Sequence, residues 1–305
     1  MKVLGIDSSG LVASVAVVED DILLAEYTVN YKKTHSQTLL PMLKEIGDMI
    51  NLDLNSLDAI AIAAGPGSFT GLRIGSATAK GLGLALDKPI IPVPTVDGLA
   101  YDLWGTDKIV CPIMDARRNQ VYTGIYEFCD GKLQILENQM AVSVTEIAEK
   151  LNALGREVIF LGDGVPVYRK TLAEVMKIPY SFAPAHMNRQ RASAVAVLGA
   201  QYYVQGRAES AMEHKPDYLR VSQAERERAA KEKNAAPEIR RMVMEDGAAI
   251  AELEYSLFRD AWSEKSILET LKQPNAICLI AEKADRTAGY LLAYTAAEEM
   301  EIARI

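Results

Sequence analysis

The sequence GPGSFTGLRIG occupies residues 65–75, between an apolar run at 59–64 and a helix that we expect to extend to Leu86. Glycines at a strand-to-helix turn permit positive φ and a close approach of other backbone, and the first helical turn offers unpaired N–H groups. Such a turn could bind an anion. No Gly-Lys-Ser/Thr triplet follows, which excludes a Walker A loop. On the pattern alone, a tight structural turn with close helix packing is the better interpretation.

Small residues recur every four positions along the helix that follows. One row contains Gly71, Gly75, Ala79 and Gly83, and a neighbouring row contains Ala77, Gly81 and Ala85. Each glycine inside a helix costs about 1 kcal/mol relative to alanine. We therefore expect a compensating contact, in which a neighbouring helix of this chain or of a partner comes unusually close.

The preceding helix, expected from Ser36 to Ile50, also has an unusual surface. Its apolar positions cover almost half of the circumference: Leu39, Leu40, Met42, Leu43, Ile46, Met49 and Ile50. A well-buried core helix would explain this pattern. One core face with a methionine-rich flank for a partner would explain it too. We favour the partner because two adjacent helices deviate in the same way.

Strands and helices alternate on both sides of these two helices. We expect strands at 3–7, 11–18, 22–29 and 59–64, and again at 109–114, 121–128, 133–142 and 158–161. Further helices are expected at 145–154, 167–176 and 192–203. The order βββαβα therefore occurs twice, which predicts a duplicated α/β architecture with halves at about 1–105 and 106–221.

The composition changes after this first domain, 1–221. Residues 222–236, SQAERERAAKEKNAA, are rich in charge and contain no large apolar side chain. Such a segment cannot bury a core face, so we predict a linker or a solvated helix. Pro237 begins a second domain, 237–305, that opens with a strand followed by a helix.

Polar residues at the strand ends are the candidates for chemistry. Asp7, Ser8 and Ser9 follow the first strand, where a carboxylate could face a nucleotide or only start the turn. His35 precedes a helix, where a lone histidine is usually a cap or a surface residue. A polar turn holding Asp115, Arg117 and Arg118 offers charge-assisted contacts, and solvated hairpin charges explain it equally well.

The bulk properties exclude several classes of protein. The formal net charge of −8 disfavours tight direct binding of a polyanion. The three cysteines are far apart, which favours reduced thiols in a cytoplasmic protein. The N-terminus does not have the pattern of a signal peptide, and no run of about 18 apolar residues indicates a membrane span. No HxxxH or CxxC spacing supports a metal site.

Several of these segments together resemble the TsaB family over about residues 1–230. They are LGIDSSG (4–10), HSQTLLPML (35–43), GPGSFTGLRIG (65–75), MDARRNQVY (114–122) and PDYLR (216–220). The resemblance implies a degenerate duplicated fold of the actin/Hsp70/sugar-kinase type. It also implies a non-catalytic subunit that pairs with the catalytic subunit TsaD and the small ATPase TsaE. That machinery transfers a threonylcarbamoyl group to N6 of the adenosine next to the anticodon of tRNA.

The resemblance further implies which residues are involved. The contact with TsaD would use the two unusual helices, through His35, Leu39, Leu40, Met42, Leu43, Ile46, Gly71, Arg73, Gly75 and Ala79. Asp7, Ser8, Ser9, Gly65, Gly67 and Ser68 are the candidates for contact with a nucleotide, and the sequence leaves open whether a nucleotide touches this chain. We expect no catalytic residue, metal or cofactor in this chain, with ATP or ADP and metal present only in the complex. Transfer RNA would be reached through the complex, and the free chain could form a homodimer.

Residues 237–305 resemble the first half of a GNAT acetyltransferase of the RimI type. The marks are IRRMVMEDGAAIAELE (239–254), Phe258, Trp262-Ser263 and Ala288-Gly289-Tyr290. Acetyl-CoA binding is not expected, because the sequence stops before the loop whose amides hold the pyrophosphate. We also expect an unpaired edge strand near 301–305.

Two alternative functions therefore stay open. The first is a TsaB–RimI fusion whose complete form acetylates the N-terminal alanine of a ribosomal protein. The second is an actin-like enzyme that binds and turns over a nucleotide.

Overall fold

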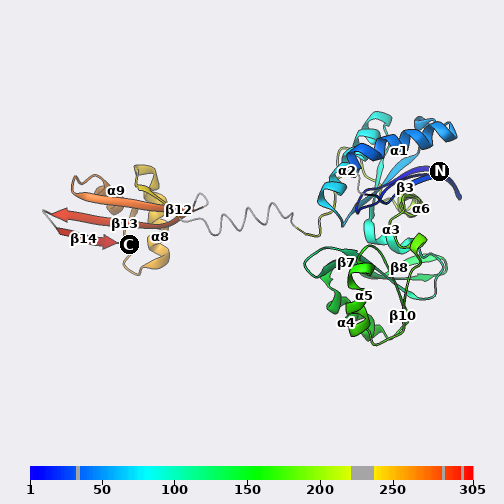
Figure 1. Ribbon diagram of the computed structural model, residues 1–305. Helices are drawn as coiled ribbons and strands as arrows, with labels where there is room; N and C mark the ends of the chain where they lie inside the picture. Colours follow the sequence, from blue (N-terminus) through cyan, green and yellow to red (C-terminus); the bar gives the residue numbers. More distant parts are fainter. Residues whose placement is uncertain (32–34, 221–236, 284–285, 297–298, 305) are drawn as a thin grey trace. The chain divides into compact units, whose positions relative to one another are not determined.

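The computed structural model describes residues 1–31, 35–220, 237–283, 286–296 and 299–304 (Figure 1). The chain divides into two compact units, Met1–Arg220 and Val221–Ile305. The expected linker at 222–236 lies outside the described residues.

The first unit consists of two halves with the same order of elements. The first half contains β1 (Lys2–Asp7), β2 (Ala13–Glu19), β3 (Ile22–Val29), α1 (His35–Ile50), β4 (Ala59–Gly65), α2 (Phe69–Leu86), β5 (Ile90–Pro94) and α3 (Thr95–Tyr101). The second contains β6 (Ile109–Asp115), β7 (Gln120–Cys129), β8 (Lys132–Ser143), α4 (Val144–Leu154), β9 (Val158–Leu161), α5 (Gly164–Val175), β10 (Tyr180–Phe182) and α6 (Ala192–Val204).

The two five-stranded sheets have equivalent strand orders, β3-β2-β1-β4-β5 and β8-β7-β6-β9-β10. In each sheet the first three strands are antiparallel, and the last two run parallel to the first. The predicted duplicated α/β fold is confirmed, and each half has one more strand and helix than the predicted βββαβα.

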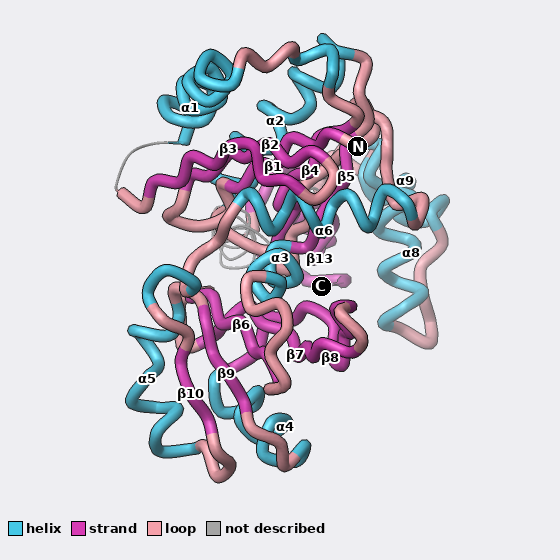
Figure 2. Tube along the Cα trace, turned by 90° about the vertical axis from the view of Figure 1, so that its right-hand side faces the viewer, coloured by secondary structure: helices cyan, strands magenta, loops and turns pink. Residues whose placement is uncertain are grey.

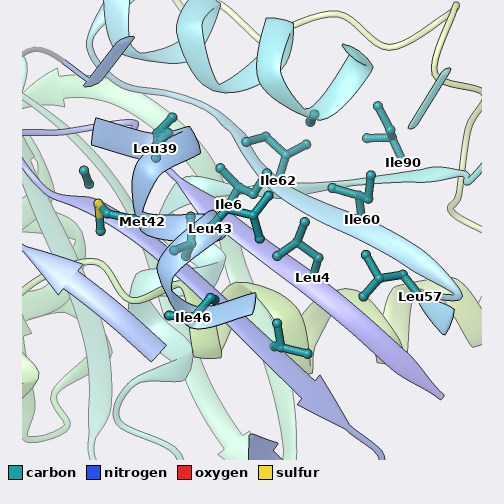
Figure 3. Packing of buried hydrophobic residues seen from close by; sticks show 14 of the residues in the cluster. Leu4, Ile6, Leu39, Met42, Leu43, Ile46, Leu57, Ile60, Ile62 and Ile90 are labelled. Atoms are coloured by element: carbon teal, nitrogen blue, oxygen red, sulfur yellow. The ribbon is translucent and has the colours of Figure 1, made fainter. Parts of the chain in front are cut away.

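Helices cover both faces of the first sheet because its central strands are apolar on both sides. α1 and α2 pack on one face, where Leu39, Met42, Leu43 and Ile46 meet the strands (Figure 3). α6, from the second half, packs on the other face through residues such as Val195 and Leu198. α3 packs on the second sheet, so that α3 and α6 lie between the two sheets (Figure 2).

Local signals set the ends of the helices. Ser68 caps the N-terminus of α2 by accepting from Gly71 N, and Asp87 ends that helix in the left-handed conformation. Ser143 caps α4 in the same way, and Gly155 ends it. α2 thus begins at Phe69 and ends at Leu86, the predicted end.

The second unit is a four-stranded antiparallel sheet with helices packed on its core face. Its elements are β11 (Glu238–Arg241), a 3₁₀ turn (Met244–Asp246), α8 (Gly247–Leu257), α9 (Glu264–Leu271), β12 (Ala276–Lys283), β13 (Arg286–Ala296) and β14 (Glu299–Arg304). The strand order follows the sequence, so that β14 is an edge strand among the described residues. Its core includes Met242, Ile250, Ile267, Ile280 and Leu292.

Candidate functional site

The glycine-rich segment packs directly against the turn between β1 and β2. Ser68 N donates to the Ser9 carbonyl oxygen at 2.6 Å, and Ser8 Oγ donates to the Gly71 carbonyl oxygen at 2.9 Å. A Cβ added to Gly67 would lie 2.3 Å from the Ser9 carbonyl oxygen, and one added to Gly71 would lie 2.1 Å from that of Ser8. The glycines therefore permit a contact between backbones that no other residue allows.

The next glycines of the same row also face atoms of this unit. A Cβ on Gly75 would lie 2.4 Å from Ser8 Oγ, and one on Gly83 would lie 2.9 Å from the Ala211 Cβ. The expectation that a neighbouring helix approaches this row is therefore wrong. A turn and a loop occupy the space, because they can follow the helix more closely than a second helix with side chains.

The carboxyl group of Asp7 is buried and bonded within its own turn. Its Oδ1 accepts from Ser9 N at 2.8 Å and from Ser9 Oγ at 2.7 Å. Burial raises the pKa of Asp7 to about 6, and the bonds from Ser9 and the nearby His35 oppose that shift. The geometry is that of an Asx turn. The structure thus brings Asp7, Ser8 and Ser9 together with Gly67 and Ser68, as the sequence predicted, and nucleotide binding there stays a prediction.

The predicted partner residues fall into a buried set and an exposed set. The buried set belongs to the core of the unit and consists of Leu39, Met42, Leu43, Ile46, Gly71, Gly75 and Ala79. Leu40, 54% exposed, and Arg73 are on the surface. His35 is half-buried, and its Nε2 donates to the Gly10 carbonyl oxygen at 2.9 Å. Only the exposed side chains are available to a partner without rearrangement.

Other exposed residues on the same two helices were not among the predicted partner residues. Met49 is 75% exposed and Leu84 is 58% exposed. Ala77, Gly81 and Ala85 are exposed as well, and a Cβ on Gly81 would meet no atom within 4 Å. The two rows of small residues in α2 therefore differ: one is filled from inside the unit, and the other is open.

The polar turn of the second half lies between β6 and β7. Three successive residues, Arg117, Arg118 and Asn119, have positive φ angles of 59°, 54° and 61°. Asp115 Oδ1 accepts from Arg117 N at 2.8 Å and from the Tyr168 hydroxyl at 3.2 Å. The sequence left open whether Asp115 makes charge-assisted contacts or is a solvated hairpin charge, and in the structure its carboxylate holds the turn.

The segment just before the charged stretch, which the sequence marked only as part of the family pattern, connects the two halves. Asp217 N donates to the Ala64 carbonyl oxygen at 2.7 Å, at the end of β4. Arg220 Nη1 donates to the Ala116 carbonyl oxygen at 2.8 Å, in the turn of the other half. In the sequence, this connecting role was indicated only by an aromatic residue at 218 and a basic residue at 220.

A buried polar cluster between the sheets was also missed. Asp97, at the start of α3, accepts from the Tyr126 hydroxyl of β7 at 2.7 Å and from the Tyr202 hydroxyl of α6 at 2.8 Å. Burial raises the pKa of Asp97, and the two tyrosine bonds oppose that shift. The signal in the sequence was a single charged residue within the apolar stretch 90–100.

Metal sites and membrane spans are both absent from the part of the chain that the structure describes. Within those ranges, no group of three or more His, Cys, Asp or Glu side chains could hold a metal ion. Among the helices that the structure describes, none combines the length and the apolar character needed to cross a membrane.

Comparison with known proteins assigns the family. A protein from Bacillus subtilis, the tRNA threonylcarbamoyladenosine biosynthesis protein TsaB, is 34% identical over 227 residues, which cover 74% of this chain and 96% of that protein. This chain belongs to the TsaB family. The TsaB protein of Escherichia coli is 30% identical over 239 residues, which cover 76% of this chain and 100% of that protein.

A family model and a solved structure agree with membership of the TsaB family. The model described as "TsaD: tRNA N6-adenosine threonylcarbamoyltransferase" matches residues 23–228. YeaZ from Pseudomonas aeruginosa is 26% identical, with a TM-score of 0.63, and the match covers 72% of this chain and 99% of YeaZ. The family model ends at residue 228, so the described part of the second unit lies outside it.

Proposed function

We propose that this chain is the non-catalytic, activating subunit of a tRNA N6-adenosine threonylcarbamoyltransferase complex. In this proposal it pairs with a TsaD-like catalytic subunit, and a TsaE-like ATPase joins the pair. The curated relatives that share most of its first unit are TsaB proteins of tRNA threonylcarbamoyladenosine biosynthesis, which supports a role in that pathway. ATP or ADP and any metal would be bound at the level of the complex.

The observation that carries the pairing is the outer surface of α1 and α2. Leu40, Met49 and Leu84 are large apolar side chains that the unit leaves exposed there. Beside them, Ala77, Gly81 and Ala85 leave the backbone of α2 accessible. A glycine at an exposed helical position weakens the helix with no compensation from this chain. A partner helix lying close against α2 would supply that compensation and cover the apolar side chains.

The packing of the β1–β2 turn supports a non-catalytic role. The groups that would cradle a phosphate there are bonded to each other, Ser68 N to the Ser9 carbonyl and Ser9 N to Asp7. Opening such a site would require these hydrogen bonds to break and the glycine contacts to separate. The arrangement therefore favours a structural use of this turn.

The test is light scattering on a sizing column, with the chain alone and mixed with the TsaD-like subunit of the same organism. We expect a mixed species that replaces any homodimer, since both assemblies would use the same apolar surface. Leu40→Glu and Leu84→Glu should each prevent the mixed species, because a charge would be buried in the interface. Met42 is unsuitable for this purpose because it lies in the core.

The matched control is Val167→Glu, which places the same charge on α5, where Val167 is 57% exposed. This variant should pair like the wild type. Two unmixed peaks for the wild-type proteins at micromolar concentrations would refute the proposed pairing. Turnover of ATP by the isolated chain would instead favour an actin-like enzyme.

A second candidate function concerns the second unit. Its order of one strand, two helices and three antiparallel strands agrees with the first half of a GNAT acetyltransferase. In this proposal, the complete protein would be a TsaB–RimI fusion that acetylates the N-terminal alanine of a ribosomal protein. Calorimetric titration with acetyl-CoA tests it, and binding by the second unit would favour an acetyltransferase.

A further inference from the structure

The turn between β6 and β7 presents two arginines in an unfavourable backbone conformation. Arg117 and Arg118 both have positive φ, as does Asn119 after them. Residues with a Cβ avoid this conformation, and asparagine tolerates it better than arginine does. Residues held in such conformations concentrate at functional sites, where the surroundings fix them.

Four hydrogen bonds hold this turn in place. Ala116 N donates to the Gln120 carbonyl at 3.0 Å, and Gln120 N donates to the Arg117 carbonyl at 3.1 Å. Arg117 N donates to the Asp115 carboxylate, and Arg220 donates to the Ala116 carbonyl. The backbone of the turn is therefore fixed from both sides.

The guanidinium groups of Arg117 and Arg118 are free, in contrast to this fixed backbone. Both residues are exposed, and neither guanidinium has a hydrogen bond or an ion pair with any residue that the structure describes. Some other arginines of this acidic chain do have carboxylate partners: Arg191 pairs with Glu26, Arg156 with Glu127, and Arg240 with Asp246 and Glu282. Arg117 and Arg118 are two adjacent arginines without a carboxylate partner among the described residues, so the turn is locally positive in a chain of net charge −8.

A series of side-chain contacts links the turn to α2. Arg220 is bonded to the turn. Two residues earlier in the sequence, the Tyr218 hydroxyl accepts a hydrogen bond from Arg73 Nε at 3.2 Å. The Arg73 guanidinium lies 4.0 Å from the centre of the Phe69 ring, and the Phe69 and Tyr218 ring centres are 4.9 Å apart. Four arginines and two aromatic rings are therefore connected across the two halves.

We propose that Arg117 and Arg118, together with Arg220, which bonds to their turn, and Arg73, which bonds to Tyr218, form a contact site for the phosphate backbone of RNA. Arginine binds phosphate through two parallel hydrogen bonds, and such contacts position RNA without reading its sequence. An acidic protein surface is a less suitable partner. The turn from 115 to 120 has no large apolar side chain, whereas protein interfaces have an apolar core.

This inference rests on the proposed function, since a tRNA-modifying complex provides the RNA. It assigns a direct contact to a chain that was expected to reach tRNA only through its partners. The phosphates would approach the first unit where the segment 217–220 joins its two halves.

The experiment compares two charge-reversed variants for binding of an unmodified tRNA transcript, at several salt concentrations. R117E/R118E reverses the proposed site. K132E/K177E changes the net charge by the same amount but away from the turn. Lys132 pairs with the end of β7 that lies farthest from the turn, and Lys177 follows the C-terminal end of α5. Both the chain alone and its mixture with the TsaD-like subunit are measured.

We expect R117E/R118E to bind tRNA at least about tenfold more weakly. The slope of log affinity against log salt concentration should be smaller in magnitude by roughly 1.5, since each phosphate contact contributes roughly 0.7–0.9 to that slope. K132E/K177E should stay within about twofold of the wild type. R117K/R118K keeps the charges and should keep most of the affinity, which separates charge from an effect on the fold. Thermal unfolding of each variant checks that the fold is retained.

Equal affinities and salt slopes for the two charge-reversed variants would overturn the inference. So would a loss of pairing with the TsaD-like subunit at unchanged tRNA affinity, because the arginines would then bind an acidic protein surface. If the wild-type chain does not pair with the TsaD-like subunit, the proposed function is refuted instead. The tRNA affinities of the chain alone then still test the RNA site.

Discussion

Asp7 carries a carboxyl group that is almost completely shielded from water and has no cationic partner within hydrogen-bonding distance among the described residues. Its two bonds from Ser9 stabilise the ionised form, but burial has the larger effect, so the pKa is raised to about 6. The neutral carboxylic acid is therefore the favoured form of this residue in mildly acidic solution. The consequence is a measurable dependence of stability on pH.

We predict that Asp7 lowers the stability of the first unit as the pH rises from about 4 to about 6. The unfolded residue loses its proton near pH 3.8, whereas the folded residue keeps it until about pH 6, so the folded state binds more protons in this window. The difference corresponds to something on the order of 3 kcal/mol. Asp7→Asn, which is neutral throughout, should lack this decline.

Urea unfolding at pH 4 and pH 7 measures this effect. The chain has two tryptophans, so a Trp262→Phe background leaves Trp104 as the reporter of the first unit. If the free energy of unfolding falls as much between pH 4 and pH 7 in Asp7→Asn as in the Trp262→Phe parent, Asp7 is not the source of the pH dependence.

The residues around Asp7 could be grouped from the sequence, because strand ends in a parallel arrangement meet at one edge of a sheet. Ser8, Ser9, Gly67 and Ser68 do meet there. The sequence could not show that they bond to one another, because a glycine-rich turn permits an open site and a packed one equally well. The arginines at 117 and 118 were recognised, but their left-handed backbone has no signature in the residue types.

At the scale of the element, α2 carries two rows of small residues with different environments. Gly71 belongs to the row that faces the β1–β2 turn, where an added Cβ would lie 2.1 Å from a carbonyl oxygen. Gly81 belongs to the open row, where an added Cβ would meet nothing within 4 Å. α2 therefore contains one glycine that packing requires and one that the isolated chain does not need.

We predict opposite effects of the same substitution at these two positions. Gly71→Ala should destabilise the first unit by about 2 kcal/mol or more, because backbone must move to admit the methyl group. Gly81→Ala should stabilise it by roughly 0.5–1 kcal/mol, because alanine is the better helix former.

The free energy of unfolding of both variants, followed through Trp104, tests this contrast. Gly81→Ala also serves as the control for the general effect of alanine in α2. Equal destabilisation by the two substitutions would contradict a difference in environment between the two rows.

The long elements were predictable because apolar runs and helical periodicity extend over many residues in them. β5, α3 and β10 were missed, and each is seven residues or shorter. Prolines interrupt β5, and α3 contains a glycine and two β-branched residues, so local propensity argues against both. Tertiary packing between the two sheets stabilises them instead, and single-sequence patterns do not contain that information.

At the scale of the whole first unit, Asp97 ties three elements together. It lies on α3, and its two oxygens accept from tyrosines of β7 in the second sheet and of α6 on the first. A buried carboxylate with both oxygens bonded is stable, whereas one with a lost partner is costly. This cluster therefore fixes how the two halves pack.

We predict that Tyr126→Phe and Tyr202→Phe each destabilise the first unit by about 1–3 kcal/mol, because each leaves one Asp97 oxygen buried without a donor. The double variant should differ from the sum, since the two tyrosines share one carboxylate. Tyr203→Phe is the control: Tyr203 is exposed and should change stability by less than about 0.5 kcal/mol. Urea unfolding of the three single variants measures this. A Tyr126→Phe variant as stable as the control would show that the cluster does not hold the halves together.

The position of α6 has a consequence for how this polypeptide is made. The helix comes from the end of the first unit, yet it covers a face of the first sheet, and Ser14 and Glu26 of that sheet bind its first residues. The last strand of that sheet ends at Pro94, about a hundred residues before α6 is complete. At a synthesis rate of 5–20 residues per second, the ribosome needs roughly 5–20 s for this stretch. During that time an apolar sheet face is exposed on the nascent chain, which makes it a substrate for chaperones that bind newly made proteins.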